Sequence, residues 1–339
     1  MHSTEIGFLL LVAAGLLNAS FSLPMKFTRQ WAWENTWLAW SLFALLLLPA
    51  TATWCTVPAL MQVYGEAGAS LLLRVAFFGA CWGLAQVFFG IAVEKIGIAL
   101  TFSLVLGTSA AVGALVPLLF QHRAMLQTRA GHELLLGIAL MLLGVAICAA
   151  AGQWRENCLS GSSGARRSAT SSGLILAVLC GCGASFQNFG IAFGAHLLDL
   201  ARAKGASPAY AANAVWLPLL LGGAVPNLLY CIFLLRKNAT VGRFFRVHPG
   251  HWLLALTMGV FWFGSLELYG AATARLGSLG PALGWPLFMS LIVVTASLLG
   301  VLTGEWRLSG RKPLVLQWVG VGSVIAAIVV LAAAGRVQT

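Results

Sequence analysis

Long apolar runs separated by short polar connections dominate the pattern of this chain. A helix needs roughly 20 apolar residues to cross a bilayer, and runs of this length recur along the whole sequence. They fall at positions 4–24, 37–61, 73–94, 97–120, 132–152, 173–196, 209–235, 251–272, 281–304 and 313–334. The pattern therefore predicts an all-α integral membrane protein with ten transmembrane helices.

The seventh run, 209–235, carries the strongest signal for a bend. It combines Pro218 with Gly222, Gly223 and Pro226. Membrane helices tolerate such residues where neighbouring helices or a polar cavity satisfy the freed backbone groups. We expect this run to be bent, either at a functional site or as a kink that serves packing alone.

Composition strengthens the membrane assignment. Of 339 residues, 60% are hydrophobic and 9% are charged, and the mean hydropathy is +0.90, whereas about a quarter of the residues of a soluble domain are charged. The net charge of +11 lies mainly in short connections, so it indicates orientation and contact with lipid headgroups, not nucleic acid. The seven cysteines include no CxxC pair, and we expect no metal and no cofactor.

The basic residues also predict an orientation. Most of them lie in the connections after the first, third, fifth, seventh and ninth runs. Cytoplasmic loops carry the excess of Lys and Arg, and ten crossings leave both termini on one side. Both termini are therefore expected outside the cytoplasm.

The two halves of the chain resemble one another. GACWGLAQVFFGIAVEKIG (79–97) and GVFWFGSLELYGAATARLG (259–277) share the spacing G-x2-W-x7-G-x-A-x2-[KR]-x-G. The Ser/Gly-rich segment 153–172 is typical of a linker. We expect two five-helix repeats, 1–152 and 173–339. An odd number of crossings inverts the second, as in many secondary transporters.

Glu267 is the candidate for proton chemistry. It lies within the eighth run, where an ionisable group costs about 2.5–3.5 kcal/mol on insertion scales, so such residues usually face the bundle interior and serve function. A carboxyl removed from water can load and release a proton near neutral pH. Three roles stay open: proton coupling, a buried structural acid, or direct substrate contact. The other acids fall at helix ends or connections.

Other polar residues at membrane depth are candidates for substrate binding. Gln86 is the first of them, because it lies one helical turn after Trp82 and next to Val87, which pairs with Glu267 in the repeat alignment. We expect Gln86 and Glu267 to enter the interior from corresponding helices of opposite halves, although Gln86 could instead join two helices by a hydrogen bond. Of the adjacent amides Gln187 and Asn188, at least one should face the interior. The full candidate set is Gln86, Trp82, Gln187, Asn188, Asn18, Trp262, Trp285, Phe21 and Asn213.

The aromatic candidates allow two interpretations. Trp82 and Trp262 match in the repeat alignment, so they could stack on the ring of a substrate or pack symmetrically in the core. Trp31, Trp33, Trp37, Trp54 and Trp306 lie near helix ends, where interfacial belts explain them.

Three stretches resemble the L-rhamnose–proton symporter family of the drug/metabolite transporter superfamily. They are PMKFTRQWAWENTW (24–37), CWGLAQVFFGIAVEKIGIALTFSLVLG (81–107) and GEWRLSGRKPL (304–314). The resemblance spans most of the chain. It implies ten helices in two inverted repeats and proton-driven sugar uptake, with L-rhamnose as the expected substrate.

The resulting expectation is a monomeric secondary transporter in a lipid bilayer that moves a monosaccharide with protons by alternating access. An exporter of amino acids, metabolites or drugs with the same fold is the alternative, because fold alone does not fix function. The sequence contains no HExxH motif and no Walker-type loop, so an enzyme is not expected and no catalytic residue is assigned.

Overall fold

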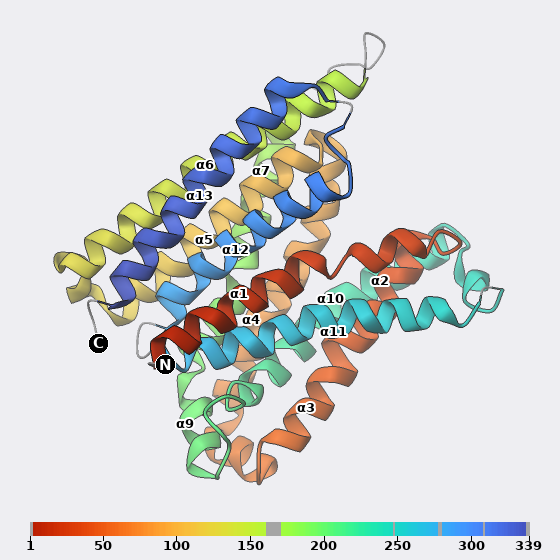
Figure 1. The fold of residues 1–339 in the computed structure, drawn as a ribbon. Coiled ribbons are helices and arrows are strands. Elements are labelled where there is room, and N and C mark those ends of the chain that lie inside the picture. Colours follow the sequence, from red (N-terminus) through yellow and green to blue (C-terminus); the bar gives the residue numbers. More distant parts are fainter. Residues whose placement is uncertain (1–2, 161–170, 247, 277–279, 308, 337–339) are drawn as a thin grey trace.

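The computed structural model describes residues 3–160, 171–246, 248–276, 280–307 and 309–336, and these residues form helices joined by short connections. Figure 1 shows their arrangement. The elements are α1 (Ser3–Ser20), η1 (Leu23–Phe27), α2 (Trp33–Ser41), η2 (Leu42–Leu47), α3 (Leu48–Thr56), α4 (Leu60–Ile96), α5 (Ile98–Gln121), η3 (Arg123–Gln127), α6 (Arg129–Ser160), α7 (Ser171–Ala184), α8 (Phe186–Phe193), α9 (Ala195–Ala203), α10 (Asn213–Lys237), η5 (Val241–Phe244), α11 (Gly250–Thr273), α12 (Gly280–Leu302) and α13 (Arg311–Arg336).

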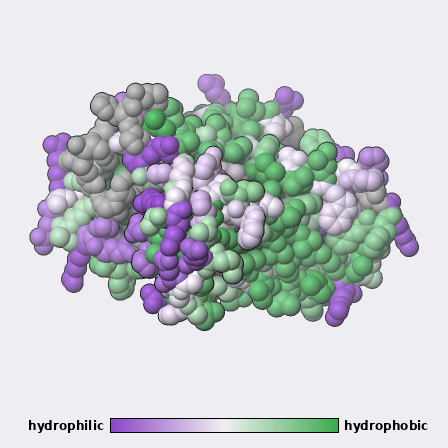
Figure 2. Space-filling view, turned by 90° about the horizontal axis from the view of Figure 1, so that it is seen from below, coloured by the Kyte–Doolittle hydropathy of each residue, from purple (hydrophilic) through white to green (hydrophobic). Residues whose placement is uncertain are grey.

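The prediction of an all-α protein with ten membrane-crossing helices is confirmed. Within the described residues, 10 helical spans are long and apolar enough to cross a bilayer. Figure 2 shows a broad hydrophobic surface over the middle and right of the view, with hydrophilic residues gathered mainly in the left half and scattered along the edges. We call the end that carries both chain termini the terminus end. The opposite end, where α6 ends and α7 begins, is the linker end (Figure 1).

Several predicted boundaries were displaced. The second span runs over Trp33–Thr56, and the third begins at Leu60, well before the predicted residue 73. The reason is that α4 continues past a single non-helical residue, Gly68, with φ +78°. α6 continues to Ser160, so residues 153–160 of the predicted linker are helical, and residues 161–170 lie outside the described part of the chain.

The backbone breaks lie outside the seventh run, which the prolines and glycines predicted to be bent. α10 is one helix from Asn213 to Lys237 and contains Pro218 and Pro226. Instead, the sixth span is divided into α7 and α8 at Ser185, and the second contains the π-helical turn η2. A π turn fits the sequence there, because Pro49 follows and cannot donate a backbone hydrogen bond.

The spans pack in a regular set of pairs. α6 lies along α13, and α5 crosses α12 between them and the remaining helices (Figure 1). α1 packs on α11 and α12, while α7 packs on α4 and α5. α10 packs on α4 and on the α2–η2–α3 span, which also contacts α11.

Small residues permit the closest of these approaches. A β-carbon at Gly79 of α4 would overlap the backbone carbonyl oxygen of Leu219 in α10, and one at Gly83 would overlap that of Gly223. Without a hydrophobic force between helices in lipid, such close packing is a main source of association energy. The α4–α10 pair therefore depends on glycine at Gly79.

Gly79→Ala should destabilise the fold by about 1–3 kcal/mol, because the added methyl group forces α4 away from α10. The measurement is thermal unfolding of the purified protein in detergent. Gly322→Ala is the matched control, since a β-carbon at that helical glycine meets no atom within 4 Å. Equal melting temperatures for the two variants would contradict the packing account.

Candidate functional site

Glu267 joins a polar cluster near the terminus end. Its Oε2 accepts a hydrogen bond from Nδ2 of Asn213, the first residue of α10, at 3.2 Å. The same amide donates to Oγ1 of Thr56, the last residue of α3, at 2.9 Å. Thr53 Oγ1 in turn donates to the Asn213 carbonyl oxygen at 3.1 Å. The carboxyl of α11 is thus tied to the ends of two other spans.

The cluster has more acceptors than donors. Glu267 Oε1 and Asn213 Oδ1 are both buried and have no hydrogen-bond partner among the described residues. An unsatisfied buried polar group costs about 1–3 kcal/mol. A proton on Glu267 would convert one of these two acceptors into a donor. The hydrogen-bond inventory of the cluster therefore favours the neutral acid.

Glu34 shows the contrasting arrangement. Sequence analysis placed it at a helix end, but its side chain is buried at the linker end. Its Oε1 accepts hydrogen bonds from Thr240 Oγ1 at 2.7 Å and Asn238 Nδ2 at 3.0 Å. This carboxylate is supplied with donors, as a structural acid should be, and Glu267 is not.

Four aromatic side chains meet in the middle of the bundle, and we call them the aromatic cluster: Phe21, Trp40, Trp82 and Trp262. Trp82 of α4 stacks on Trp262 of α11 with ring centroids 5.4 Å apart. Trp40 of α2 packs edge-on against Trp262 at 5.2 Å and contacts Phe21 at 5.9 Å. The predicted central placement of Trp82 and Trp262 is thus what the structure shows, and both are buried.

Asn18 lies beside this cluster. Its Nδ2 donates to Ser265 Oγ at 2.8 Å, and Ser265 donates to the Trp262 carbonyl oxygen at 2.6 Å. Ser265 stands one turn after Trp262 on α11, so Asn18 connects α1 to the helix that also carries Glu267. The contact places a half-buried carboxamide next to aromatic surface.

Gln86 and Glu267 do not meet at a common seam. Gln86 lies four residues, about 6 Å, beyond Trp82 towards the linker end, whereas Glu267 lies five residues, about 7.5 Å, beyond Trp262 towards the terminus end. α4 and α11 run in opposite directions. Residues that follow Trp82 and residues that follow Trp262 therefore lie on opposite sides of the stacked tryptophans. Gln86 is half-buried beside the aromatic cluster, and Glu267 belongs to a separate polar cluster.

The two adjacent amides of α8, Gln187 and Asn188, differ in their hydrogen bonding. Asn188 Oδ1 accepts from the Tyr269 hydroxyl, and its Nδ2 donates to the carbonyl oxygens of Gly113 at 2.8 Å and Pro281 at 3.0 Å. This full set of bonds joins α5, α8, α11 and α12. Gln187, by contrast, is buried with its Nε2 donor unpartnered among the described residues. Gln187 is the amide with capacity for a ligand.

Trp285, another candidate, lies in the core. It is 1% exposed, and its Nε1 donates to the Ser109 carbonyl oxygen at 3.0 Å. Its ring packs against Tyr269 and Phe288, and a β-carbon at Gly113 would overlap it. No face of this ring is open to a substrate, so we assign it to packing.

Sequence reasoning missed four members of these clusters: Trp40, Thr53, Thr56 and Ser265. Trp40 lies one turn after Trp37 in a span whose other tryptophans were explained by the membrane interface, and its buried Nε1 has no partner among the described residues. Hydroxyls such as Thr56 and Ser265 are too common in membrane helices to single out from spacing. Within the described residues, no three His, Cys, Asp or Glu side chains are grouped to hold a metal ion.

Ten spans around an interior that holds a buried acid, amides and stacked tryptophans define a multi-pass membrane transporter. The family described as L-rhamnose-proton symport protein (RhaT) matches residues 3–335. L-rhamnose-proton symporters of Yersinia pestis (strain Pestoides F), Yersinia pseudotuberculosis (serotype O:1b, strain IP 31758) and Salmonella typhi are each 30% identical over 317 residues, 91% of this chain and 92% of theirs. The chain belongs to the L-rhamnose-proton symport protein family, whose members are transporters and not enzymes.

Tyr269→Phe tests the assignment of Asn188 to structure. Removal of the hydroxyl leaves Asn188 Oδ1 buried without a donor and should cost about 1–3 kcal/mol of stability, measured by thermal unfolding. The KM for transported sugar should stay within twofold of the unmodified protein. Tyr210→Phe, at an exposed tyrosine, is the control. A large rise in KM with unchanged stability would instead place Asn188 in the binding site.

Proposed function

We propose that this protein takes up L-rhamnose or a closely related monosaccharide together with protons, by alternating access. The family and the L-rhamnose-proton symporters at 30% identity support this function over the exporter alternative. The observation that carries the proton part is the Glu267 carboxyl, which has one oxygen bonded to Asn213 and the other buried without a donor.

Glu267 is the proposed proton carrier. Its hydrogen bonds can be satisfied only when it is protonated. The neighbouring Asn213 Oδ1 is a further buried acceptor without a donor, and only the protonated acid supplies one. Asn213, a substrate candidate by sequence, takes a different role in this proposal. Through its bonds to Glu267 and Thr56 it positions the carboxyl and connects it to the terminus end of the bundle.

The sugar is proposed to bind at the aromatic cluster. Asn18, Gln86 and Gln187 supply hydrogen-bonding groups for hydroxyls. Asn18 bonds to Ser265, one turn from Trp262, Gln86 follows Trp82 by one turn, and Gln187 lies on α8, which packs against α4. Aromatic faces suit the C–H surfaces of a sugar ring. The buried Trp40 Nε1, which has no acceptor among the described residues, is a further donor there.

Helix α11 connects the two sites. It carries Trp262 and Ser265 at the aromatic cluster and Glu267 about one turn away. Loss of the proton would leave a desolvated carboxylate beside Asn213 and change the energy of the contact between α11 and the α3 and α10 ends. A shift of α11 would then alter the aromatic cluster, which links proton binding to sugar binding.

We also propose the inverted-repeat architecture, with halves 1–152 and 173–339. The helix pairing supports it, because exchanging each span with its counterpart in the other half reproduces the observed contacts. The α4–α7 pair corresponds to α11–α1, α5–α7 to α12–α1, and α4–α10 to α11 with the second span. Alternating access then requires only that the halves exchange conformations. The proposed setting is a monomer in a bacterial inner membrane with periplasmic termini.

Glu267→Gln should abolish sugar-induced proton uptake into proteoliposomes while sugar exchange between the two sides continues, because the amide mimics the neutral acid. A fluorescent pH indicator and radiolabelled L-rhamnose report the two activities. Glu66→Gln, at a surface acid paired with Lys204, is the control. Proton uptake by the Glu267 variant at the unmodified rate would rule out this residue as the carrier.

Gln86→Leu should raise the KM for the sugar about tenfold, corresponding to the loss of one hydrogen bond of about 1.4 kcal/mol in a buried site. Gln62→Leu changes the same side chain at an exposed position of the same helix and should leave KM unchanged. Initial uptake rates over a range of sugar concentrations measure both. If the two variants behave alike, Gln86 is not a ligand.

A further inference from the structure

A second candidate site lies at the linker end, away from the aromatic cluster and Glu267. A cavity of about 290 Å³ opens between α5, α6, α12 and α13. Apolar side chains form much of its wall, among them Leu106, Val145 and Val293 towards the interior and Phe102 and Ala296 at the surface. Phe102 and Ala296 are exposed, so the cavity opens between α5 and α12 past apolar side chains.

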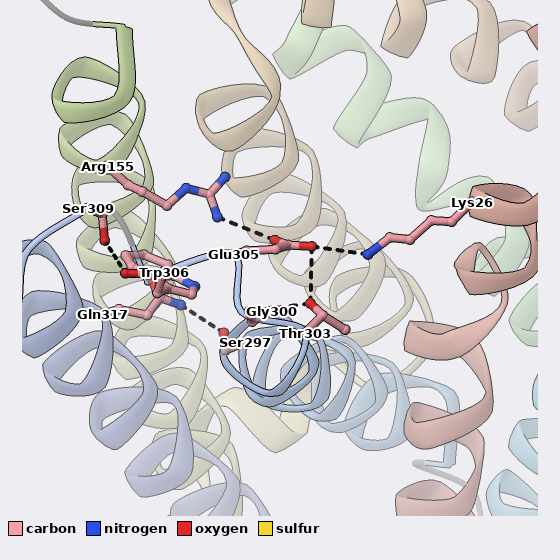
Figure 3. A network of polar contacts seen from close by, with 9 residues as sticks. All are labelled: Lys26, Arg155, Ser297, Gly300, Thr303, Glu305, Trp306, Ser309 and Gln317. Carbon is pink, nitrogen blue, oxygen red and sulfur yellow. Dashed lines mark hydrogen bonds and ion pairs between the residues drawn. The ribbon is translucent and has the colours of Figure 1, made fainter. Parts of the chain in front are cut away.

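Charged and aromatic groups lie at the outer end of this cavity (Figure 3). Arg155, near the end of α6, donates from Nη1 to Glu305 Oε2 at 3.3 Å. Lys26, at the end of the first span, pairs with Glu305 Oε1, also at 3.3 Å. The Arg155 guanidinium lies 5.1 Å above the ring of Trp306, which is buried in the α12–α13 connection.

Arg155 has a hydrogen-bond donor available for an anion. Its Nε is buried without an acceptor among the described residues, although a guanidinium carries five N–H donors. Two cations share the Glu305 carboxylate, and the half-exposed Glu305 pairs contribute little stability. Exposed Arg307, Arg311 and Lys312 follow in the same connection and the start of α13.

The distribution of apolar and polar groups favours an amphiphile over a free sugar. A sugar placed between Leu106 and Val293 would meet mostly apolar side chains, and each hydroxyl left without a partner would cost about 1–3 kcal/mol. A hydrocarbon chain suits these walls, and a neighbouring crevice of about 310 Å³ between α5 and α6 shares the walls at Ser103 and Val145. Basic pockets between membrane helices at the lipid–water boundary are typical sites for anionic lipid headgroups.

We propose that the cavity bounded by α5, α6, α12 and α13 binds one anionic phospholipid, with its phosphate on Arg155 and an acyl chain between Leu106 and Val293. The site is independent of the sugar and proton sites. It would anchor the ends of α6 and α12, which Glu305 already connects to the first span through Lys26.

Native mass spectrometry of the purified protein tests this assignment. Phosphatidylglycerol and phosphatidylcholine with identical acyl chains are each added at equal concentration. The unmodified protein should retain at least three times more phosphatidylglycerol, and Arg155→Gln should reduce retention to the level of phosphatidylcholine. Arg311→Gln removes an exposed cation of the same region and should retain phosphatidylglycerol like the unmodified protein.

Two further arms distinguish the alternatives. Ala296→Phe fills the cavity without removing a charge and should also abolish the preference, in protein that stays monodisperse on gel filtration. Excess inorganic phosphate should not displace the lipid. Equal retention by the Arg155 and Arg311 variants would overturn the proposal, and displacement by inorganic phosphate alone would show an anion site without a lipid chain. Sugar transport defects in either variant have no bearing on these outcomes.

Discussion

A polar atom inside the hydrocarbon region of a bilayer has no water to bond, so each buried donor and acceptor of this protein must find its partner within the chain. Most of them do. Asn188 uses both its amide protons and its oxygen to join four helices, and Glu34 is supplied with two donors. Against this background four of the exceptions are informative. Glu267 Oε1, Asn213 Oδ1, Gln187 Nε2 and Trp40 Nε1 lack partners among the described residues, and they belong to the proposed proton and sugar sites.

These exceptions divide into two places along the bundle. The carboxyl cluster lies towards the terminus end, where α3 ends and α10 begins. The aromatic cluster lies in the middle, and Gln86 continues it towards the linker end. Because α11 contributes Trp262 to one and Glu267 to the other, a single helix connects the proposed sugar site with the proposed proton site. A shared site is not needed for coupling in this arrangement.

Sequence alone predicted the membrane class and the ten spans, because apolar length is a local property of the chain. It also singled out Glu267 as a candidate, because the cost of a buried charge is a local property too. It could not predict which groups Glu267 would contact. Asn213, which bonds to the carboxyl, and Thr56, which bonds to Asn213, are distant from it in sequence and are brought there by the packing of α3 and α10 against α11. The choice between Gln187 and Asn188 likewise depended on Tyr269, which lies on another helix. Trp40 was overlooked because interfacial tryptophans precede it in the same span. Trp285 was a binding candidate because a sequence does not distinguish a tryptophan that packs in the core from one that contacts a ligand.

The central claim is that Glu267 takes up a proton when sugar binds at a separate place on α11. Proton uptake on addition of L-rhamnose to purified protein in weakly buffered detergent solution tests it most directly. At a pH where Glu267 is ionised without sugar, L-rhamnose should cause uptake of up to one proton per bound sugar, and Glu267→Gln should bind sugar without proton uptake. Sugar-linked proton uptake that persists in Glu267→Gln would show that another group carries the proton.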